Sequence, residues 1–293
     1  MKALIFGASG QDGTYLAEAC RSNDITPIGI SRAGSEIRGD VADFSFVESL
    51  VREHSPDFIF HLAANSSTAH DALFENHAAI STGTLNVLEA VHRLRLPARV
   101  FITGSSVQFQ NHGVPVTEST PFEALSAYAV ARIQSVYAAR YYRSLGVRTF
   151  VGYFFHHESP MRKPRHLSQK IVQAAKRIKS GSREVLEIGD LGVEKEWNFA
   201  GDIAAAVLTL VRQDRVHEAV IGSGETHSVR DWVECCFSRL GMDWRNHVKE
   251  IAGYRPEFRR LVSDPSVIRG LGWKPSVGFR ELCAMMIGEG PKS

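Results

Sequence analysis

The first thirteen residues constrain the fold of this chain more than any other stretch. Residues 3–6 are an apolar run that is long enough for a buried strand and too short for a helix. Gly7, Gly10 and Gly13 follow with the spacing G-x-x-G-x-x-G, and residues 14–20 have the composition of a helix. A strand, a glycine turn and a helix in this order predict a dinucleotide site, with the pyrophosphate at the N-terminus of the helix.

The three glycines by themselves are a weak signal, because glycine-rich turns also occur in unrelated α/β domains. Here a strand precedes them and a helix follows, so each glycine has a role in holding the ligand. The first allows a tight turn, the second lets the backbone approach a pyrophosphate, and the third lets helix and strand pack closely. The residues of this turn that are predicted to bind the cofactor are Gly7, Ser9, Gly10, Gln11, Asp12 and Gly13.

Apolar runs and helical patterns alternate through the first half of the chain. Further buried strands are predicted at residues 26–30, 56–62, 98–103 and 147–152, and helices at residues 44–53, 73–94 and 126–145. Such alternation predicts an α/β fold with a doubly wound parallel Rossmann sheet. Residues 1–152 are therefore expected to form a dinucleotide-binding domain, to which residues 197–222 return with one more strand.

The rest of the chain lacks this alternation. From Tyr153 on, the chain is expected to leave the sheet, and residues 161–165 form a basic turn before an amphipathic helix at residues 166–180. Residues 153–196 and 223–293 are predicted to form a smaller mixed lobe that binds the substrate. In open α/β sheets the ligand lies beyond the carboxyl ends of the strands, so the lobe is expected to face that edge.

The composition excludes several classes of function. The chain has 34 basic and 32 acidic residues and a net charge of +2, which gives no reason to expect nucleic acid or a membrane surface as a partner. No apolar run is long enough to span a membrane, and Met1 leads directly into the first predicted strand, so a cytoplasmic protein is expected. The 4 cysteines show no C-x-x-C spacing, so free thiols and no metal site are predicted.

Arg32, directly after the second predicted strand, bears on the choice of cofactor. An acidic residue at this place holds the ribose hydroxyl of NAD, whereas an arginine suits the 2′-phosphate of NADP. Arg32 therefore favours NADP(H) over NAD(H), although it could also be an ordinary solvated arginine. Asp40 is predicted to meet the adenine or to cap the following helix. The neighbouring apolar and small residues expected to lie against the cofactor are Val41, Leu62, Ala63 and Ala64.

Short motifs spread along almost the whole chain match one known family. They are H-L-A-A at residues 61–64, G-T-L-N at 83–86, Y-A-V-A-R at 128–132, H-E-S-P at 157–160, K-E-W at 195–197, R-P at 255–256 and G-W-K-P at 272–275. The chain thus resembles the extended short-chain dehydrogenase/reductase family, in the branch of GDP-mannose 4,6-dehydratases and GDP-4-keto-6-deoxy-sugar reductases. The resemblance implies a GDP-linked sugar as substrate, and a homodimer through the helices around residues 85–94 and 126–140.

The resemblance also implies which residues carry the chemistry. Tyr128 lies at the family's proton-transferring tyrosine, and Arg132 replaces the lysine that lowers the tyrosine's pKa from one helical turn away. Arginine keeps the positive charge but is bulkier and planar, so the exchange is not conservative. Both residues are also expected to contact the cofactor. Ser106 lies at the family's Ser/Thr beside the substrate oxygen, with its neighbour Ser105 as the alternative.

Gln108 is the most discriminating position of the chain. Two residues after the Ser/Thr, the dehydratases carry a glutamate that removes the C5 proton so that water can leave. An amide has no ionisable group that could act as this base. Gln108 therefore argues against dehydration and leaves hydride transfer intact.

Several residues are expected near the nucleotide sugar because of the same resemblance. An arginine at a diphosphate has a physical reason, since its planar fork pairs with phosphate oxygens. Lys170 could instead belong to a solvated helix face, and Glu158 could read a guanine edge or pair with Arg162. The residues predicted to bind the substrate are Ser66, Ser105, Ser106, His157, Glu158, Arg162, Lys170, Lys195, Trp197 and Arg255.

Three functions remain open at this point. The first is an NADP-dependent reductase of a GDP-4-keto-6-deoxy sugar, with or without epimerisation. The second is a GDP-mannose 4,6-dehydratase with an altered base. The third is a catalytically weak protein that binds NADPH and a nucleotide sugar, which the departures Gln108 and Arg132 would favour. A third departure favours it too, since Ile80 stands where members of the family usually carry a polar residue.

Overall fold

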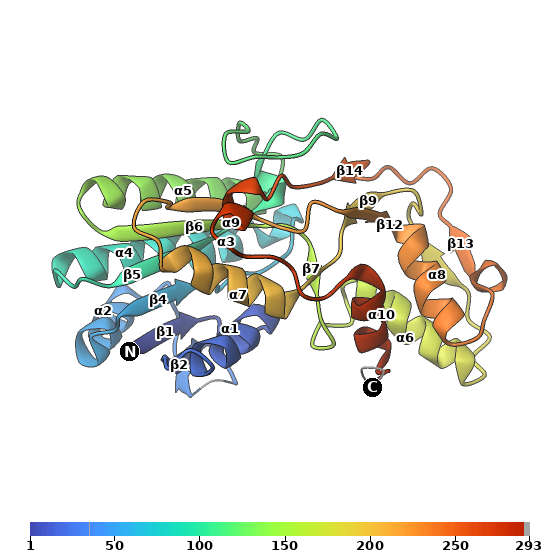
Figure 1. The fold of residues 1–293 in the computed structure, drawn as a ribbon, viewed down its shortest axis with the longest axis horizontal. Coiled ribbons are helices and arrows are strands. Elements are labelled where there is room, and N and C mark those ends of the chain that lie inside the picture. The colour runs from blue at the N-terminus through green and yellow to red at the C-terminus, as the bar shows by residue number, and fades with distance from the viewer. Residues whose placement is uncertain (35, 290–293) are drawn as a thin grey trace.

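A parallel sheet of seven strands forms the larger part of the molecule in the computed structural model, which describes residues 1–34 and 36–289 (Figure 1). Its spatial order is β11-β6-β5-β4-β1-β2-β3. The strands are β1 (Lys2–Phe6), β2 (Thr26–Ser31), β3 (Ile37–Arg38), β4 (Phe58–His61), β5 (Arg99–Ser105), β6 (Arg148–Phe154) and β11 (Glu218–Ile221). The chain builds outward from β1 in both directions, so the crevice between the carboxyl ends of β1 and β4 is the expected ligand site. The predicted Rossmann architecture is confirmed.

Helices cover both faces of this sheet, as Figure 1 shows. One face carries α2 (Phe44–His54), α4 (Gly83–Arg93) and α5 (Ala127–Ser144), and the other carries α1 (Gln11–Arg21) and α7 (Ala200–Val211). Within β1, Leu4 and Phe6 pack into the first layer, and Ala3 and Ile5 pack into the second. A strand that is buried on both faces is apolar at every position. This is why the run at the start of the sequence could be recognised.

The helix predicted at residues 73–94 is not regular. It consists of α3 (Leu73–Asn76), a π-helical segment η2 (His77–Thr82) and α4. Inside η2 the carbonyl of Ile80 accepts a hydrogen bond from Ser135 Oγ at 3.2 Å and lies 3.4 Å from His61 Nε2. Side chains from other elements thus bind the helix backbone here, and apolar spacing in the sequence cannot reveal such contacts.

The prediction that the chain leaves the sheet at Tyr153 is wrong by two residues. Tyr153 and Phe154 still pair with Val220 and Ile221 of β11. The Tyr153 hydroxyl donates a hydrogen bond to Glu218 Oε2 at 2.6 Å, so a polar group on the neighbouring strand satisfies this buried tyrosine.

A smaller lobe of helices and short strands lies beyond one end of the sheet (right in Figure 1). Its core combines aliphatic, tryptophan and cysteine side chains from its three longer helices. These helices are α6 (Leu167–Lys179), α8 (Val229–Arg239) and α10 (Phe279–Ile287). The short strands are β7 (His157–Glu158), β8 (Leu186–Ile188), β9 (Glu194–Glu196), β10 (Asn198–Phe199), β12 (Thr226–Ser228), β13 (Val248–Glu250) and β14 (Arg260–Leu261).

Single turns complete the fold. They are η1 (His70–Ala72), η3 (Ser106–Gln108), η4 (Trp244–Asn246) and α9 (Ser266–Gly270). Cys20, Cys235, Cys236 and Cys283 are free thiols, as predicted. Within residues 1–34 and 36–289, the structure has no helix with both the length and the apolar character that crossing a membrane requires.

Candidate active site

The glycine turn after β1 is shaped to receive a phosphate group. Gly7 has a positive φ of 92°, and a Cβ atom built on it would lie 2.7 Å from the backbone nitrogen of Ala63. A Cβ on Gly13 would overlap the carbonyl of Gly7, so α1 can approach the turn only with glycine here. Gly10 caps α1 without a side-chain hydrogen bond, which leaves the first N–H groups of the helix free to bind an anion. The turn therefore fits the pyrophosphate of a dinucleotide.

A first cavity of about 440 Å³ continues from this turn over β2 and β4. Arg32 stands at its edge and forms an ion pair of 2.9 Å with Glu75, whose second oxygen accepts a hydrogen bond from Asn65. The Arg32 side chain is 62% exposed, so it can also turn to a ligand phosphate. The predicted cofactor residues that line this cavity are Gly7, Ser9, Gly10, Arg32, Asp40, Val41, Leu62, Ala63 and Ala64.

A second cavity of about 420 Å³ shares the glycine turn and Lys163 with the first, and extends toward the smaller lobe. Gln11, Asp12 and Gly13 line it. The predicted catalytic and substrate residues found on its wall are Ser66, Ser105, Ser106, Tyr128, Arg132, His157, Arg162 and Lys195. The fold thus brings residues from positions 7 to 261 to one crevice.

Tyr128 lies in the first turn of α5, which begins at the edge of the second cavity. The Ser126 side chain caps this helix by accepting a hydrogen bond from the Ala129 N–H at 3.1 Å. One turn further on, Arg132 is 3% exposed and donates a hydrogen bond to the carbonyl of Thr103 at 2.6 Å. Its guanidinium carbon lies 5.0 Å from the centre of the Tyr128 ring, so a permanent positive charge faces the phenol.

The end of β5 brings Ser105, Ser106 and Val107 to the cavity wall but not Gln108. Gln108 is fully buried, and its Oε1 accepts a hydrogen bond from the Ser105 N–H at 2.8 Å. The glutamine therefore shapes the turn that presents the two serines. If Ser105 rather than Ser106 is the residue beside the substrate oxygen, the position two residues on is Val107. Neither Val107 nor Gln108 carries a carboxylate.

Two side-chain pairs join the N-terminus of α1 to β7 and the residue after it. His157 Nε2 lies 2.9 Å from Asp12 Oδ1, and Ser159 Oγ donates to Gln11 Oε1 at 2.8 Å. Both His157 nitrogens face oxygen acceptors, the other being the Phe155 carbonyl at 2.8 Å, which fits a charged imidazolium. Burial opposes that charge, but Asp12 outweighs burial and raises the pKa of His157. Asp12, which was predicted to bind the cofactor, and His157, which was predicted to bind the substrate, thus bind each other.

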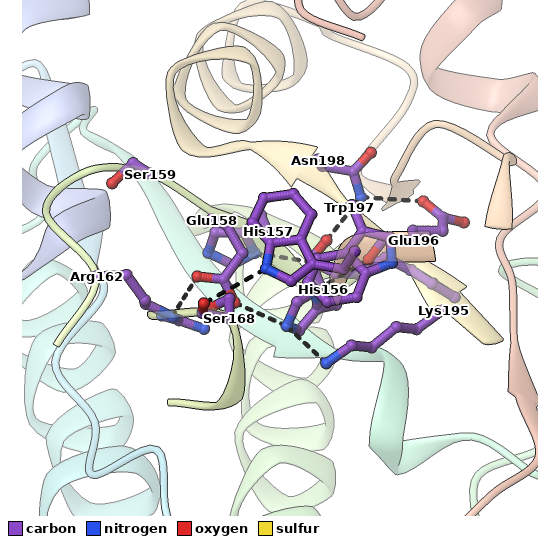
Figure 2. A network of polar contacts seen from close by, with 12 residues as sticks. His156, His157, Glu158, Ser159, Arg162, Ser168, Lys195, Glu196, Trp197 and Asn198 are labelled. Carbon is purple, nitrogen blue, oxygen red and sulfur yellow. Dashed lines mark hydrogen bonds and ion pairs between the residues drawn. The ribbon is translucent and has the colours of Figure 1, made fainter. Parts of the chain in front are cut away.

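A second charged group centres on Glu158, which is completely buried behind the cavity wall (Figure 2). His156 Nε2 lies 2.8 Å from Glu158 Oε1, and Arg162 Nε lies 3.0 Å from Glu158 Oε2. Burial disfavours the carboxylate, but the cationic groups around it outweigh burial and lower the pKa of Glu158. Glu158 therefore pairs with Arg162, one of the two predicted roles, and does not itself line the cavity.

Three other predicted substrate residues lie away from both cavities. Trp197 is buried and stacks on Trp232 with ring centres 4.5 Å apart, so it belongs to the lobe core. Lys170 is exposed on α6 and donates to the Glu187 carbonyl at 3.4 Å. Arg255 is exposed in the loop between β13 and β14.

Several residues that line the second cavity were not predicted from the sequence. They are His156, Lys163, Arg165, His166, Phe258 and Leu261. The basic turn at residues 161–165 was a signal for two of them, but the apolar side chains Phe258 and Leu261 gave none. Arg165 Nη2 donates to Ser66 Oγ at 3.2 Å, which joins this turn to the loop after β4.

The second cavity is strongly positive in character. Asp12 is the only carboxylate among the described residues that line it, and His157 neutralises this carboxylate. The cationic side chains that line the same cavity are Arg132, Arg162, Lys163, Arg165 and Lys195. Such a wall attracts an anionic ligand. Within the described part of the chain, no group of three or more His, Cys, Asp or Glu side chains could hold a metal ion.

Comparison with known proteins places these features in one family. A sequence model described as GDP-mannose 4,6 dehydratase matches residues 4–286. GDP-mannose 4,6 dehydratase 1 and 2 of Arabidopsis thaliana are 31% and 32% identical to this chain, covering 98% of it and 89% and 86% of their own lengths. GDP-mannose 4,6-dehydratase of Sinorhizobium fredii is 30% identical over 98% of this chain and 95% of its own.

Solved structures agree with the fold. RMD from Pseudomonas aeruginosa complexed with NADPH matches with a TM-score of 0.87 at 20% identity, covering 98% of each chain. dTDP-glucose 4,6-dehydratase from Bacillus anthracis in complex with NAD matches with a TM-score of 0.87 at 16% identity, covering 99% of this chain and 96% of its own. At these identities the likeness extends to the fold alone.

Proposed function

This chain belongs to the GDP-mannose 4,6-dehydratase family of NAD(P)-dependent nucleotide-sugar enzymes, and from this premise we propose that it is a reductase. The substrate is a GDP-4-keto-6-deoxy sugar, whose 4-keto group is reduced with NADPH, with or without epimerisation at a neighbouring carbon. The observation that carries the proposal is the lack of a free carboxylate on the described wall of the second cavity. Elimination of water needs a base for the C5 proton, whereas reduction of a ketone needs only a hydride and a proton.

We assign proton transfer to Tyr128. The nicotinamide cofactor, when bound, supplies the hydride. The Tyr128 hydroxyl donates its proton to the carbonyl oxygen as the carbonyl carbon is reduced, so the product is an alcohol and the tyrosine is left as a phenolate. The nearby Arg132 guanidinium stabilises this phenolate. We propose that Ser106, or its neighbour Ser105, donates a hydrogen bond to the same oxygen, since both line the second cavity.

For the cofactor we propose NADP(H) rather than NAD(H). Arg32 lies at the edge of the first cavity, where it can exchange its ion pair with Glu75 for a 2′-phosphate. We predict that Arg32→Ala raises KM for NADPH about 10-fold and changes KM for NADH less than twofold, because one charge-assisted contact is lost. Initial rates with both cofactors measure this. An equal effect on the two cofactors would contradict the assignment.

The positive wall of the second cavity supports a diphosphate-linked sugar as substrate. We propose that Arg162 and Lys195 bind its phosphates, with Ser66 and Arg165 at the outer edge of the site. The choice of GDP among nucleotides rests on the family to which the chain belongs.

A second candidate function is GDP-mannose 4,6-dehydration. It is favoured by the names of the relatives that are at least 30% identical over nearly the whole chain. A dehydratase recycles its cofactor without net consumption and releases water from GDP-mannose. A reductase consumes NADPH and adds two hydrogens to its substrate.

A coupled assay separates these functions. GDP-4-keto-6-deoxy-mannose, made in situ by a known dehydratase, is supplied with NADPH, and absorbance and product mass are followed. We expect loss of NADPH and a mass gain of two hydrogens. Water loss from GDP-mannose without added dehydratase would instead establish the second candidate. No reaction with either sugar, together with retained binding of both ligands, would establish the catalytically weak protein.

We also propose that the chain acts as a homodimer. Four apolar or aromatic side chains on α4 and α5 are exposed although they lie on helices of the main sheet layer: Leu85 (47%), Val130 (37%), Tyr137 (59%) and Tyr141 (60%). A set of large exposed side chains on two adjacent helices is typical of a surface that a partner covers. Two such helices from each subunit would pack together in the dimer.

A further inference from the structure

His156 and Lys195 stand in direct contact at the wall of the second cavity (Figure 2). Lys195 Nζ lies 3.1 Å from His156 Nε2. The two residues come from separate elements, since His156 lies between β6 and β7 and Lys195 lies in β9.

The neighbours of His156 favour two different protonation states of its Nε2 atom. His156 Nδ1 faces the Glu196 carbonyl at 2.9 Å, so Nδ1 carries a hydrogen and donates it. His156 Nε2 then faces two groups with opposite demands, the Glu158 carboxylate at 2.8 Å and the Lys195 ammonium at 3.1 Å. A neutral ring can accept from Lys195 but repels Glu158. A charged ring can donate to Glu158 but repels Lys195.

The neutral and the charged ring correspond to two arrangements of the same side chains. In the first, His156 is neutral and holds Lys195, and Glu158 is paired with Arg162 alone. In the second, His156 is an imidazolium that donates to Glu158, and Lys195 is released toward the cavity. Neither Glu158 oxygen has a hydrogen bond of good geometry in the structure, which agrees with a carboxylate that still lacks a donor.

We propose that His156 is a positioning residue for Lys195, and that it takes up a proton when the diphosphate of a nucleotide sugar binds. An anion in the cavity attracts the Lys195 ammonium, and the departing ammonium leaves His156 free to protonate and to bind Glu158. No covalent bond changes in this step, and the proton comes from solvent. The proposal rests on the proposed function, because it needs an anionic substrate in the second cavity.

The charges around His156 agree with this order of events. Burial, together with the charge of Lys195, lowers the pKa of His156 to about 4, so the ring is neutral in the free protein near neutral pH. Burial lowers the pKa of Lys195 to about 8. The other charged or titratable groups that face the pair are Glu158 from β7, Arg162 from the following loop and His166 at the start of α6. The Trp197 ring lies against His156 and carries no charge.

Calorimetric titration of the NADPH-loaded protein with GDP-mannose tests the proposal. The diphosphate of GDP-mannose is esterified at both ends, so the ligand itself has no group that titrates near neutral pH. NADPH keeps a dehydratase from acting, and GDP-mannose has no keto group to reduce. The heat is measured at about pH 6.5 in two buffers of different ionisation enthalpy, which yields the number of protons exchanged.

We expect uptake of roughly half a proton or more per GDP-mannose in the native protein. His156→Asn should reduce this uptake to near zero while GDP-mannose still binds, because asparagine can donate to Glu158 without a charge. Near about pH 8 we expect a second uptake, by Lys195 itself, because burial lowers its pKa to about 8 and a bound anion favours the charged form. Lys195→Arg should abolish this second uptake, because arginine stays charged at that pH. His112→Asn, in an exposed loop of the main domain, is the matched control and should exchange protons as the native protein does.

Three results would overturn the proposal. Tight binding without proton uptake, or uptake that persists in His156→Asn, would overturn the His156–Lys195 pair and leave the proposed function standing. Binding of NADPH without any binding of GDP-mannose would overturn both.

Discussion

At the scale of single residues, the proposed proton transfer by Tyr128 depends on the positive charge of Arg132 beside its ring. The guanidinium is fixed by the Thr103 carbonyl and stays close to the phenol ring. Unlike lysine, arginine cannot lose its charge at any pH at which the protein is folded. Arg132 therefore preserves the positive charge of the family's lysine, and only the shape of the cationic group differs.

Tyr128→Phe should abolish most of the reduction. Loss of a positioned general acid lowers kcat by about 100-fold or more. The phenyl ring still packs against Arg132, so the Kd for NADPH should change less than about threefold. Steady-state rates and fluorescence titration with NADPH measure the two quantities. Unchanged kcat would assign the proton transfer to another group.

Gln108→Glu should destabilise the protein without abolishing reduction. One carboxylate oxygen can still accept from the Ser105 N–H, but the other would lie where Gln108 Nε2 now lies, buried and without a partner. A buried unpaired charge costs several kcal/mol or forces protonation. We expect a fall of several degrees in Tm and a measurable kcat at low temperature.

The control is Gln134→Glu, on the exposed side of α5, where the oxygen that accepts from Ser81 is preserved. Its Tm should remain close to that of the native protein. Complete loss of reduction in folded Gln108→Glu would contradict the view that this position shapes the turn and takes no part in the chemistry.

At the scale of elements, the contact between α1 and β7 joins the cofactor half of the site to the substrate half. Asp12 and Gln11 belong to the helix that faces the pyrophosphate, and their partners His157 and Ser159 belong to the segment that leads into the smaller lobe. The proposed cofactor site at the glycine turn and the proposed substrate site at the lobe are therefore joined by direct side-chain contacts.

The Asp12–His157 ion pair predicts a pH-dependent stability. The pKa of Asp12 is lowered by His157 against the effect of burial, so its contribution is present above its ordinary value of about 3.8 and is lost as the pH falls. The pKa of His157 is raised, so its contribution is present below its ordinary value of 6.5 and is lost as the pH rises through the raised value. The ion pair therefore makes its full contribution to stability between about pH 3.8 and pH 6.5.

His157→Gln keeps a donor for Asp12 and removes the charge. Without cofactor, its Tm should lie below that of the native protein by about 2–4 °C near pH 5, and the gap should narrow toward about pH 9. Thermal melts across this range measure the gap. A gap that widens with pH would show that the native pair is not ionic.

At the scale of the whole molecule, the exposed apolar side chains of α4 and α5 form a surface that no other element of the described chain covers. Its side chains lie on the outside of the layer that covers one face of the sheet, away from both cavities. A dimer through this face would leave the active site of each subunit open.

Tyr141→Glu should therefore convert a dimer to a monomer. Burial of a carboxylate against a second copy of the same helix is unfavourable, and two-fold symmetry would place two such charges in one interface. Sedimentation analysis at micromolar concentration measures the mass. Val114→Glu, equally exposed in a loop at 61%, is the control and should stay dimeric. A native protein that sediments as a monomer would contradict the proposal.

The division of the chain into a dinucleotide-binding domain of residues 1–152 with 197–222 and a substrate lobe remains a prediction. It is supported by the return of α7 and β11 to the main sheet. The separate apolar core shared by α6, α8 and α10 supports it as well.

The sequence by itself determined the Rossmann sheet and the glycine turn, and it determined that Tyr128 and Arg132 lie one helical turn apart. These features depend on residues that are close together along the chain, such as an apolar run, a fixed glycine spacing and one helical turn from residue 128 to residue 132. Local periodicity is visible without knowing what packs against it.

Only the tertiary structure decided which side chains line the two cavities. Gln108 and Trp197 lie at positions of family motifs but are turned into the interior, whereas Phe258 and Leu261 reach the second cavity from a distant part of the chain. The contact between His156 and Lys195 joins residues 39 positions apart. Such choices depend on the direction of each side chain and on its neighbours in space, and neither is encoded in the spacing of residues along the chain.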